Sequence, residues 1–127
     1  MNHLNQMKNK LPDFELAFFE GLVKRKPDYV EALIALAELY TKKGLYEKGL
    51  EIDKRLAELK RSDATIHYNL ACSYALVGKV QEALRTLKQA IYLGYRDFEY
   101  MKNDKDLARL HVHPEFLRLA SKGKSKT

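Results

Sequence analysis

One pattern of small, aromatic and glycine residues occurs twice in the chain, and the two copies are offset by 34 residues. The two copies are EALIALAELYTKKGLYEKGL at residues 31–50 and IHYNLACSYALVGKVQEAL at residues 66–84. Laying residues 30–63 over residues 64–97 aligns Leu36 with Leu70, Ala37 with Ala71, Tyr40 with Tyr74, Gly44 with Gly78, and Gly49 with Ala83. Self-similarity at such a period indicates that each copy is one supersecondary unit of an array.

Each copy is predicted to be a helix, a tight turn and a second helix. The packing residues of each copy recur at helical spacing, and they are Leu33, Leu36, Ala37 and Tyr40, then His67, Leu70, Ala71 and Tyr74. Gly44 and Gly78 end these runs, where a helix C-terminus favours a residue that tolerates a positive φ. A second apolar run follows each glycine. Because one such unit cannot bury both of its faces alone, the units are expected to stack.

These residues and their period resemble the tetratricopeptide repeat (TPR), a helix–turn–helix unit of 34 residues. The signature positions are Leu36, Ala37, Tyr40 and Gly44 in the first copy, and Leu70, Ala71, Tyr74, Gly78 and Ala83 in the second. The first copy departs from the pattern at Gly49, Asp53 and Arg61, where alanine, a large apolar residue and proline are usual. The second copy fits the pattern closely.

The resemblance implies an all-α fold: a short TPR α-solenoid of antiparallel helix pairs, with about two full repeats, a preceding half-repeat and short C-terminal capping helices. We expect one domain over residues 1–121, made of a half-repeat helix (13–26), repeat 1 (28–61), repeat 2 (62–95) and a C-terminal cap (96–121). Residues 122–127, KGKSKT, are expected to form a basic flexible tail. The cap resembles the terminal segments of small bacterial TPR proteins, in which a Gly-Tyr-Arg-Asp turn closes the array.

The period fails after Tyr95, and two or three short helices are predicted beyond it. They span about 97–102, 104–110 with Asp104 as N-cap, and 114–122 with Pro114 at the first helical position. The last repeat must have its apolar face covered. The residues expected to cover it are Phe98, Leu107, Leu110, Phe116 and Leu117.

Composition and charge narrow the class of protein. A hydrophobic content of 46% with 31% charged residues is typical of a globular domain and not of a disordered chain. Half of the net charge of +6 lies in KGKSKT, and elsewhere Lys24-Arg25-Lys26 is the one small basic group. A nucleic-acid surface needs clustered bases, so nucleic acid is not the favoured partner. The N-terminus lacks the apolar core of a signal peptide and no apolar run is long enough for a membrane span, so we expect a cytoplasmic protein without membrane contact.

Histidines and the single cysteine are the candidate chemical groups. His111 and His113 have a spacing compatible with chelation, and Asp104 and Asp106 are near enough in sequence to complete a metal site. The simpler interpretation is a polar capping turn. His67 is expected to be a hydrogen-bonded, inward-packing residue.

A reactive thiol at Cys72 would need a cationic neighbour, and none lies one helical turn away. The sequence also has no glycine-rich phosphate loop and no nucleophile elbow. We therefore predict no catalytic residues, no metal and no cofactor, and a protein that is not an enzyme. The lone cysteine excludes an internal disulfide.

Asp53 stands where the repeat normally packs apolar surface, and burying an unpaired aspartate is costly. One hypothesis is a hydrogen bond across the repeat junction to His67 or to a tyrosine hydroxyl such as that of Tyr68. The other is that the side chain reaches solvent.

In a stacked array the first helix of each unit lines the concave side, which is the predicted partner-binding groove. Its residues are Glu31, Ile34, Glu38, Thr41 and Lys42 from the first unit, and Thr65, Tyr68, Asn69, Cys72 and Leu76 from the second. Ile34, Tyr68 and Leu76 are expected to form an exposed apolar strip, with Tyr68 and Ile34 as anchors and Asn69 fixing a backbone group. The alternative is that the terminal segments fold over this strip.

One known use of the repeat is a clamp for the C-terminal carboxylate of chaperones. Asn69 matches the clamp pattern, but Ile34, Glu38 and Glu99 stand where it needs lysine, asparagine and a basic residue. A chaperone clamp is therefore rejected. The leading hypothesis is a non-enzymatic adaptor that binds a peptide or protein segment. The alternatives are a self-associating, homo-oligomeric helical unit and, third, salt-sensitive nucleic-acid binding.

Overall fold

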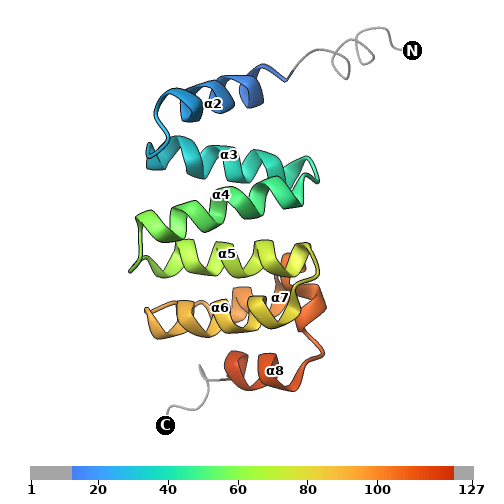
Figure 1. The fold of residues 1–127 in the computed structure, drawn as a ribbon. Helices are drawn as coiled ribbons and strands as arrows, with labels where there is room; N and C mark the ends of the chain where they lie inside the picture. The colour runs from blue at the N-terminus through green and yellow to red at the C-terminus, as the bar shows by residue number, and fades with distance from the viewer. Residues whose placement is uncertain (1–12, 122–127) are drawn as a thin grey trace, which may run out of the picture.

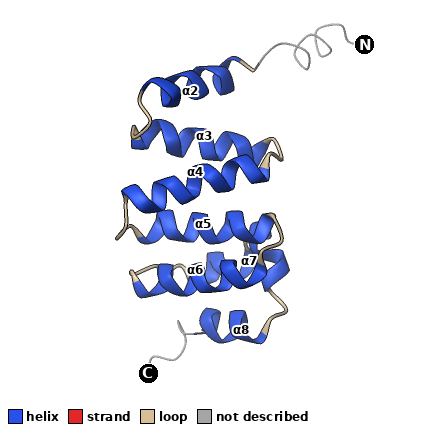
Figure 2. Ribbon diagram, in the orientation of Figure 1, coloured by secondary structure: helices blue, strands red, loops and turns tan. Residues whose placement is uncertain are grey.

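The computed structural model describes residues 13–121, and every regular element in that range is a helix (Figure 1, Figure 2). The elements are α2 (Phe14–Arg25), α3 (Val30–Lys42), α4 (Tyr46–Leu59), α5 (Ala64–Leu76), α6 (Val80–Tyr92), α7 (Phe98–Asn103), the 3-10 helix η1 (Lys105–Leu110) and α8 (Pro114–Ala120). Figure 1 shows α2 to α6 side by side in one stack, with α8 beside α6 at the far end. The predicted all-α solenoid is confirmed.

Two helical hairpins, α3–α4 and α5–α6, form the centre of the stack. Gly44 closes the first with a φ of +77° and Gly78 the second with a φ of +85°. In each turn the residue after the glycine donates to a carbonyl five residues back, Leu45 to Tyr40 at 2.8 Å and Lys79 to Tyr74 at 2.9 Å. This pattern satisfies orphan carbonyls at the helix end and requires a residue with positive φ. The predicted turns are therefore present at both glycines.

The signature residues of the repeat lie in the core. Leu36, Ala37, Tyr40, Leu70, Ala71 and Ala83 are buried, and Tyr74 is half-buried against the same core. Ala71 and Ala83 are fully buried where α5 packs on α6. Small side chains at these positions let the two helices of a unit approach closely. The small residues of the signature therefore lie where the two helices of a unit meet.

Helix α2 covers the first end of the stack. Asp13 caps it by accepting a hydrogen bond from the backbone N–H of Leu16 at 3.0 Å. The hydroxyl of Tyr40 on α3 donates to Glu20 at 2.6 Å and ties α2 to the first hairpin. No residue of α2 is fully buried, and Phe14 and Phe18 are 71% and 58% exposed. The helix therefore packs on one side and leaves an apolar face open.

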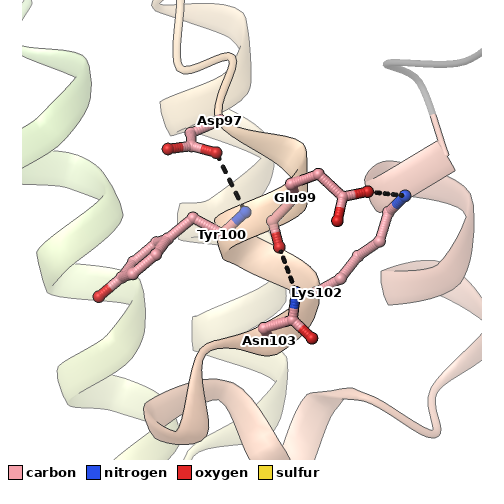
Figure 3. A network of polar contacts seen from close by, with 5 residues as sticks. All are labelled: Asp97, Glu99, Tyr100, Lys102 and Asn103. Carbon is pink, nitrogen blue, oxygen red and sulfur yellow. Dashed lines mark hydrogen bonds and ion pairs between the residues drawn. The ribbon is translucent and has the colours of Figure 1, made fainter.

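A short turn redirects the chain after α6, at the predicted Gly-Tyr-Arg-Asp sequence. Gly94 has a φ of +119°, and Tyr95 donates its N–H to the carbonyl of Ala90 at 2.9 Å. The guanidinium of Arg96 donates to the carbonyl of Ile91, also at 2.9 Å. Asp97 then caps α7 by accepting from the N–H of Tyr100 at 3.0 Å (Figure 3). Each residue of the turn has a specific structural role.

The cap contains three short helices near the predicted positions, and one detail of the prediction is wrong. The middle element is a 3-10 helix, with Asp104 at its N-cap as expected. Leu117, expected to cover the end of the array, is 56% exposed. The residues of α8 that face the core are Phe116, Leu119 and Ala120, because their spacing of three and four puts them on one side of the helix.

Leu107 and Leu110 are buried as predicted, Phe98 is half-buried, and Met101 completes the cap's contribution to the core. None of the helices within residues 13–121 has the length and apolarity that crossing a bilayer requires. The predicted basic tail at 122–127 lies outside the described residues. The division of the chain into repeat units stays a prediction.

Candidate functional site

A groove of about 930 Å³ lies between separate elements of the described part of the chain. One wall is the C-terminal half of α3 and another is α5. The third is the segment from Tyr95 through α7 to the start of η1, and Tyr46 and Asp53 contribute from α4. A smaller hollow at the α2–α3 turn is lined by Lys26 to Tyr29 alone, so it has no walls from separate elements.

Eight of the ten residues predicted for the partner-binding groove line this cavity. They are Glu38, Thr41 and Lys42 on α3, and Thr65, Tyr68, Asn69, Cys72 and Leu76 on α5. Glu31 and Ile34 do not line it. Both lie in the first half of α3, where Ile34 packs against the cluster formed by Leu33, Leu56 and Ile66. The first helices of the two units thus share a concave surface, as expected, but only toward the end of α3.

The prediction of an exposed Tyr68 is wrong. Its side chain is 3% exposed, because the cap folds over it. The ring stacks on Tyr95 with centroids 4.2 Å apart and planes 4° from parallel, and the hydroxyl donates to Asp104 at 2.6 Å. Burial raises the pKa of the Tyr68 hydroxyl, so it stays a donor. Tyr68 therefore joins α5 to the cap, and of the alternatives for the strip, coverage by the C-terminal segment is the correct one at this residue.

Cys72 lies beside two aspartates of the cap. Its sulfur, Asp104 and Asp106 offer ligand atoms within 4.8 Å of one another, a spacing that a metal ion could use. The oxygens of Asp104 are already engaged, since they accept from Tyr68, from the Cys72 thiol at 3.6 Å and from the N–H of Asp106 at 3.0 Å. Burial, and then the two aspartates, raise the pKa of Cys72 and disfavour the thiolate that binds metals and reacts. These residues fit a hydrogen-bonded junction better than a metal site.

Asp53 forms the hydrogen bond across the repeat junction that one of the two hypotheses required, but with another partner. Its side chain is 6% exposed, so it does not reach solvent. Ser73 on α5 donates to it at 2.5 Å. His67, proposed as the partner, is half-buried and instead contacts the carbonyl of Asp63 at 2.9 Å. Burial raises the pKa of Asp53 to about 6, with Glu38 adding to the shift and Ser73 opposing it.

The two C-terminal histidines are not brought into a cluster with the aspartates. Within residues 13–121, the group of Cys72, Asp104 and Asp106 is the one set of three such side chains close enough to share an ion. The ring of His111 packs near Phe116, with centroids 5.0 Å apart. His113 precedes α8 as its N-cap residue. The capping interpretation describes this turn better than chelation.

The groove is lined by more acidic than basic side chains, whereas the chain as a whole is basic. Four carboxylates line it, from Glu38, Asp53, Asp104 and Asp106, together with the ammonium groups of Lys42 and Lys105. None of these six groups takes part in an ion pair among residues 13–121, where the pairs are Lys43–Asp13, Lys54–Glu51, Arg55–Asp28 and Lys102–Glu99. The groove is thus weakly acidic on a chain with a net charge of +6.

The cap side of the groove was missed by sequence reasoning. Tyr95, Tyr100 and Lys105 line it, together with Asp104 and Asp106, which were considered as a helix N-cap and as metal ligands but not as groove residues. In Figure 3 the ring of Tyr100 points away from Glu99 and Lys102, which pair at 3.7 Å on another side of α7. Glu99 therefore does not line the groove, although the clamp comparison placed it there. One indication of this side of the groove is present in the sequence. The 34-residue period stops after Tyr95, which indicates that the following segment packs differently from a third repeat.

Comparison with known proteins agrees with the repeat. Residues 66–99, which include most of α5, all of α6 and the start of α7, match a family model for the tetratricopeptide repeat. The chain is also similar to a protein of Arabidopsis thaliana whose name describes it as chloroplastic, with 34% identity over 100 residues. The match covers 76% of this chain and 28% of that protein, so the chain spans little more than a quarter of its relative's length.

Proposed function

We propose that the chain is a non-enzymatic adaptor that binds a peptide or protein segment. The proposal is supported by the match of residues 66–99 to the tetratricopeptide repeat, a unit whose arrays present extended concave binding surfaces. The binding site is the groove between α3, α5 and the α7–η1 segment. The observation that carries this proposal is the cavity of about 930 Å³ in which walls from separate elements meet. Concave sites with apolar walls and a few placed polar groups are the usual form of binding pockets.

The side chains of the groove suit an extended segment. Thr65 and Asn69 are exposed on neighbouring turns of α5, where an amide can bond the backbone of a bound chain. Leu76 is half-buried at the end of the same helix, and Tyr100 is exposed on the opposite wall. Tyr68 lies beneath them as part of the floor. We therefore move the proposed anchors from Tyr68 and Ile34 to Leu76 and Tyr100.

The test is selection of peptides from a random decapeptide library displayed on phage, with the immobilised full-length protein as bait. We expect binding sequences to be enriched. A synthetic peptide of an enriched sequence should then lose at least tenfold in affinity for a Thr65→Arg/Asn69→Arg variant, because both long side chains would project into the groove.

A Gln89→Arg variant is the matched control, since Gln89 is exposed on α6 and does not line the groove. It should bind the peptide as the unchanged protein does. Circular dichroism would show that both variants keep their helices. Failure to enrich any sequence, or equal binding by the groove variant, would contradict the proposal.

A second candidate function, self-association, is favoured by the open apolar face of α2. Phe14 and Phe18 lie one helical turn apart and are largely exposed. Exposed apolar patches often mark protein–protein contacts, and a two-fold dimer would bury the same patch on both copies. Light scattering on the full chain, compared with a Phe14→Ser/Phe18→Ser variant, tests this. A monomeric unchanged protein at micromolar concentration would exclude it.

Three finer predictions, about location, nucleic acid and the carboxylate clamp, remain predictions. A cytoplasmic location is still a prediction of the sequence, and the word "chloroplastic" belongs to the name of the relative alone. The charge distribution still argues against nucleic acid, and Glu38 in the groove still argues against a carboxylate clamp.

A further inference from the structure

In the part of the chain that the structure describes, two carboxylates that line the groove are free to pair with a bound cation. Among residues 13–121, neither Glu38 nor Asp106 accepts a side-chain hydrogen bond or pairs with a cation. Glu38 is exposed on α3 and Asp106 is half-buried on η1. A bound segment could therefore use both carboxylates without breaking a contact that the folded chain already makes.

Tyrosine faces accompany these carboxylates. Tyr46, Tyr95 and Tyr100 line the same groove, and Tyr100 is 55% exposed. The cation–π contacts of the described region involve Tyr29 and Tyr40, so the faces of the groove tyrosines carry no cation there. A guanidinium or ammonium group over an aromatic ring and next to a carboxylate gains from both contacts.

The carboxylates make the electrostatic potential at this end of the groove negative, so a bound cation would be stabilised there. Burial and the neighbouring Asp104 raise the pKa of Asp106. The charge of Asp104 is also the main cause that raises the pKa of Tyr100. Lys42 and Lys105, which likewise line the groove, offset only part of this field.

We propose that the groove binds a peptide segment that presents an arginine or lysine side chain to Asp106 and the ring of Tyr100. This inference rests on the proposed function, since it names the chemistry of the segment that the groove takes. The basic side chain would enter between α5 and the α7–η1 segment, and the peptide backbone would run along Asn69 and Thr65 toward Glu38. A segment rich in acidic residues would meet repulsion from the same four carboxylates.

The decapeptide selection also tests this inference, through the amino-acid composition of the enriched peptides. We expect the sequences enriched on the unchanged protein to contain arginine or lysine well above their frequency in the library. A synthetic peptide of one such sequence should bind Asp106→Asn about tenfold or more weakly, since a charge-assisted hydrogen bond is lost. Replacing its basic residue with norleucine should cost the unchanged protein a similar factor, but should cost Asp106→Asn much less.

Lys105→Gln is the matched control, because it neutralises the neighbouring residue of η1 and should leave binding unchanged or stronger. If Asp106→Asn loses its helical circular dichroism, Tyr100→Ala, at an exposed position, gives the same test, since it removes the ring that the basic side chain is proposed to contact. Enriched peptides that depend on Thr65 and Asn69 but contain no excess of basic residues would overturn this inference and leave the proposed function standing. An absence of enriched peptides would overturn both.

Discussion

At the scale of single residues, Gly49 departs from the repeat pattern at a position where the structure does not require glycine. It stands where the second copy has Ala83, inside α4. A Cβ at this position would meet the Thr41 side chain at 3.4 Å and Tyr40 at 3.7 Å, which are ordinary contact distances. The backbone does not need a glycine there, whereas Gly44 adopts a φ of +77°.

We therefore expect Gly49→Ala to stabilise the protein by about 0.5–1 kcal/mol, because alanine loses less conformational freedom than glycine on helix formation. Urea unfolding followed by circular dichroism measures the change. The same substitution at Gly44 should destabilise by about 1 kcal/mol, since it forces a side chain into the left-handed region. Destabilisation by Gly49→Ala would mean that the contact with Thr41 is tighter than the geometry indicates.

At the scale of elements, the cap is held on α5 by polar contacts as well as by its apolar core. Tyr68 donates to Asp104, and the guanidinium of Arg109 donates to the carbonyls of Ala75 and Leu76 at 3.1 and 3.0 Å. Arg109 thus satisfies carbonyls at the C-terminus of α5, where a cation also interacts favourably with the helix dipole. These bonds place the η1 wall of the groove against the α5 wall.

Tyr68→Phe keeps the stack on Tyr95 and removes one donor to Asp104. We expect a loss of about 1–3 kcal/mol in the free energy of unfolding, because a buried carboxylate loses a hydrogen bond. Hydrogen exchange in residues 96–110 should accelerate more than exchange in α3 and α4. Tyr92→Phe, at an exposed position on α6, should change neither quantity. Uniform exchange throughout the chain would argue that Tyr68 is not a specific link to the cap.

At the scale of the whole molecule, the stability of the stack should depend on the protonation of Asp53. Its pKa is about 6 in the folded chain, against 3.8 for the free side chain. The folded state therefore binds a proton more tightly than the unfolded state. The stabilising contribution is complete below about pH 3.8 and is lost as the pH rises through about 6.

Lowering the pH from 7 to 5 should therefore raise the stability of the unchanged protein, relative to Asp53→Asn, by about 1 kcal/mol. Asparagine cannot titrate, and its carbonyl can still accept from Ser73. Glu38 raises the pKa of Asp53, so Glu38→Gln should reduce the effect. Urea unfolding of both proteins at the two pH values gives the difference directly. A difference that does not change with pH would show that Asp53 is ionised throughout this range.

The sequence by itself determined the repeat, the helical hairpins and the turns that close them. These features depend on local chemistry. Apolar spacing selects the packed face of each helix, and Gly44 and Gly78 terminate helices because they tolerate a positive φ. The same local rules placed eight of the proposed groove residues on one concave surface, since residues on one helix face stay together whatever packs against them.

Only the tertiary structure decided what the cap does to that surface. The stacking of Tyr95 on Tyr68 and the hydrogen bond from Ser73 to Asp53 join residues that are distant in sequence. The wall that Tyr100 and Asp106 form across the groove from α5 likewise brings together segments far apart in the chain. No period relates the cap to the repeats, so no pattern could give its orientation. Side-chain packing set that orientation, and with it the depth and the charge of the groove.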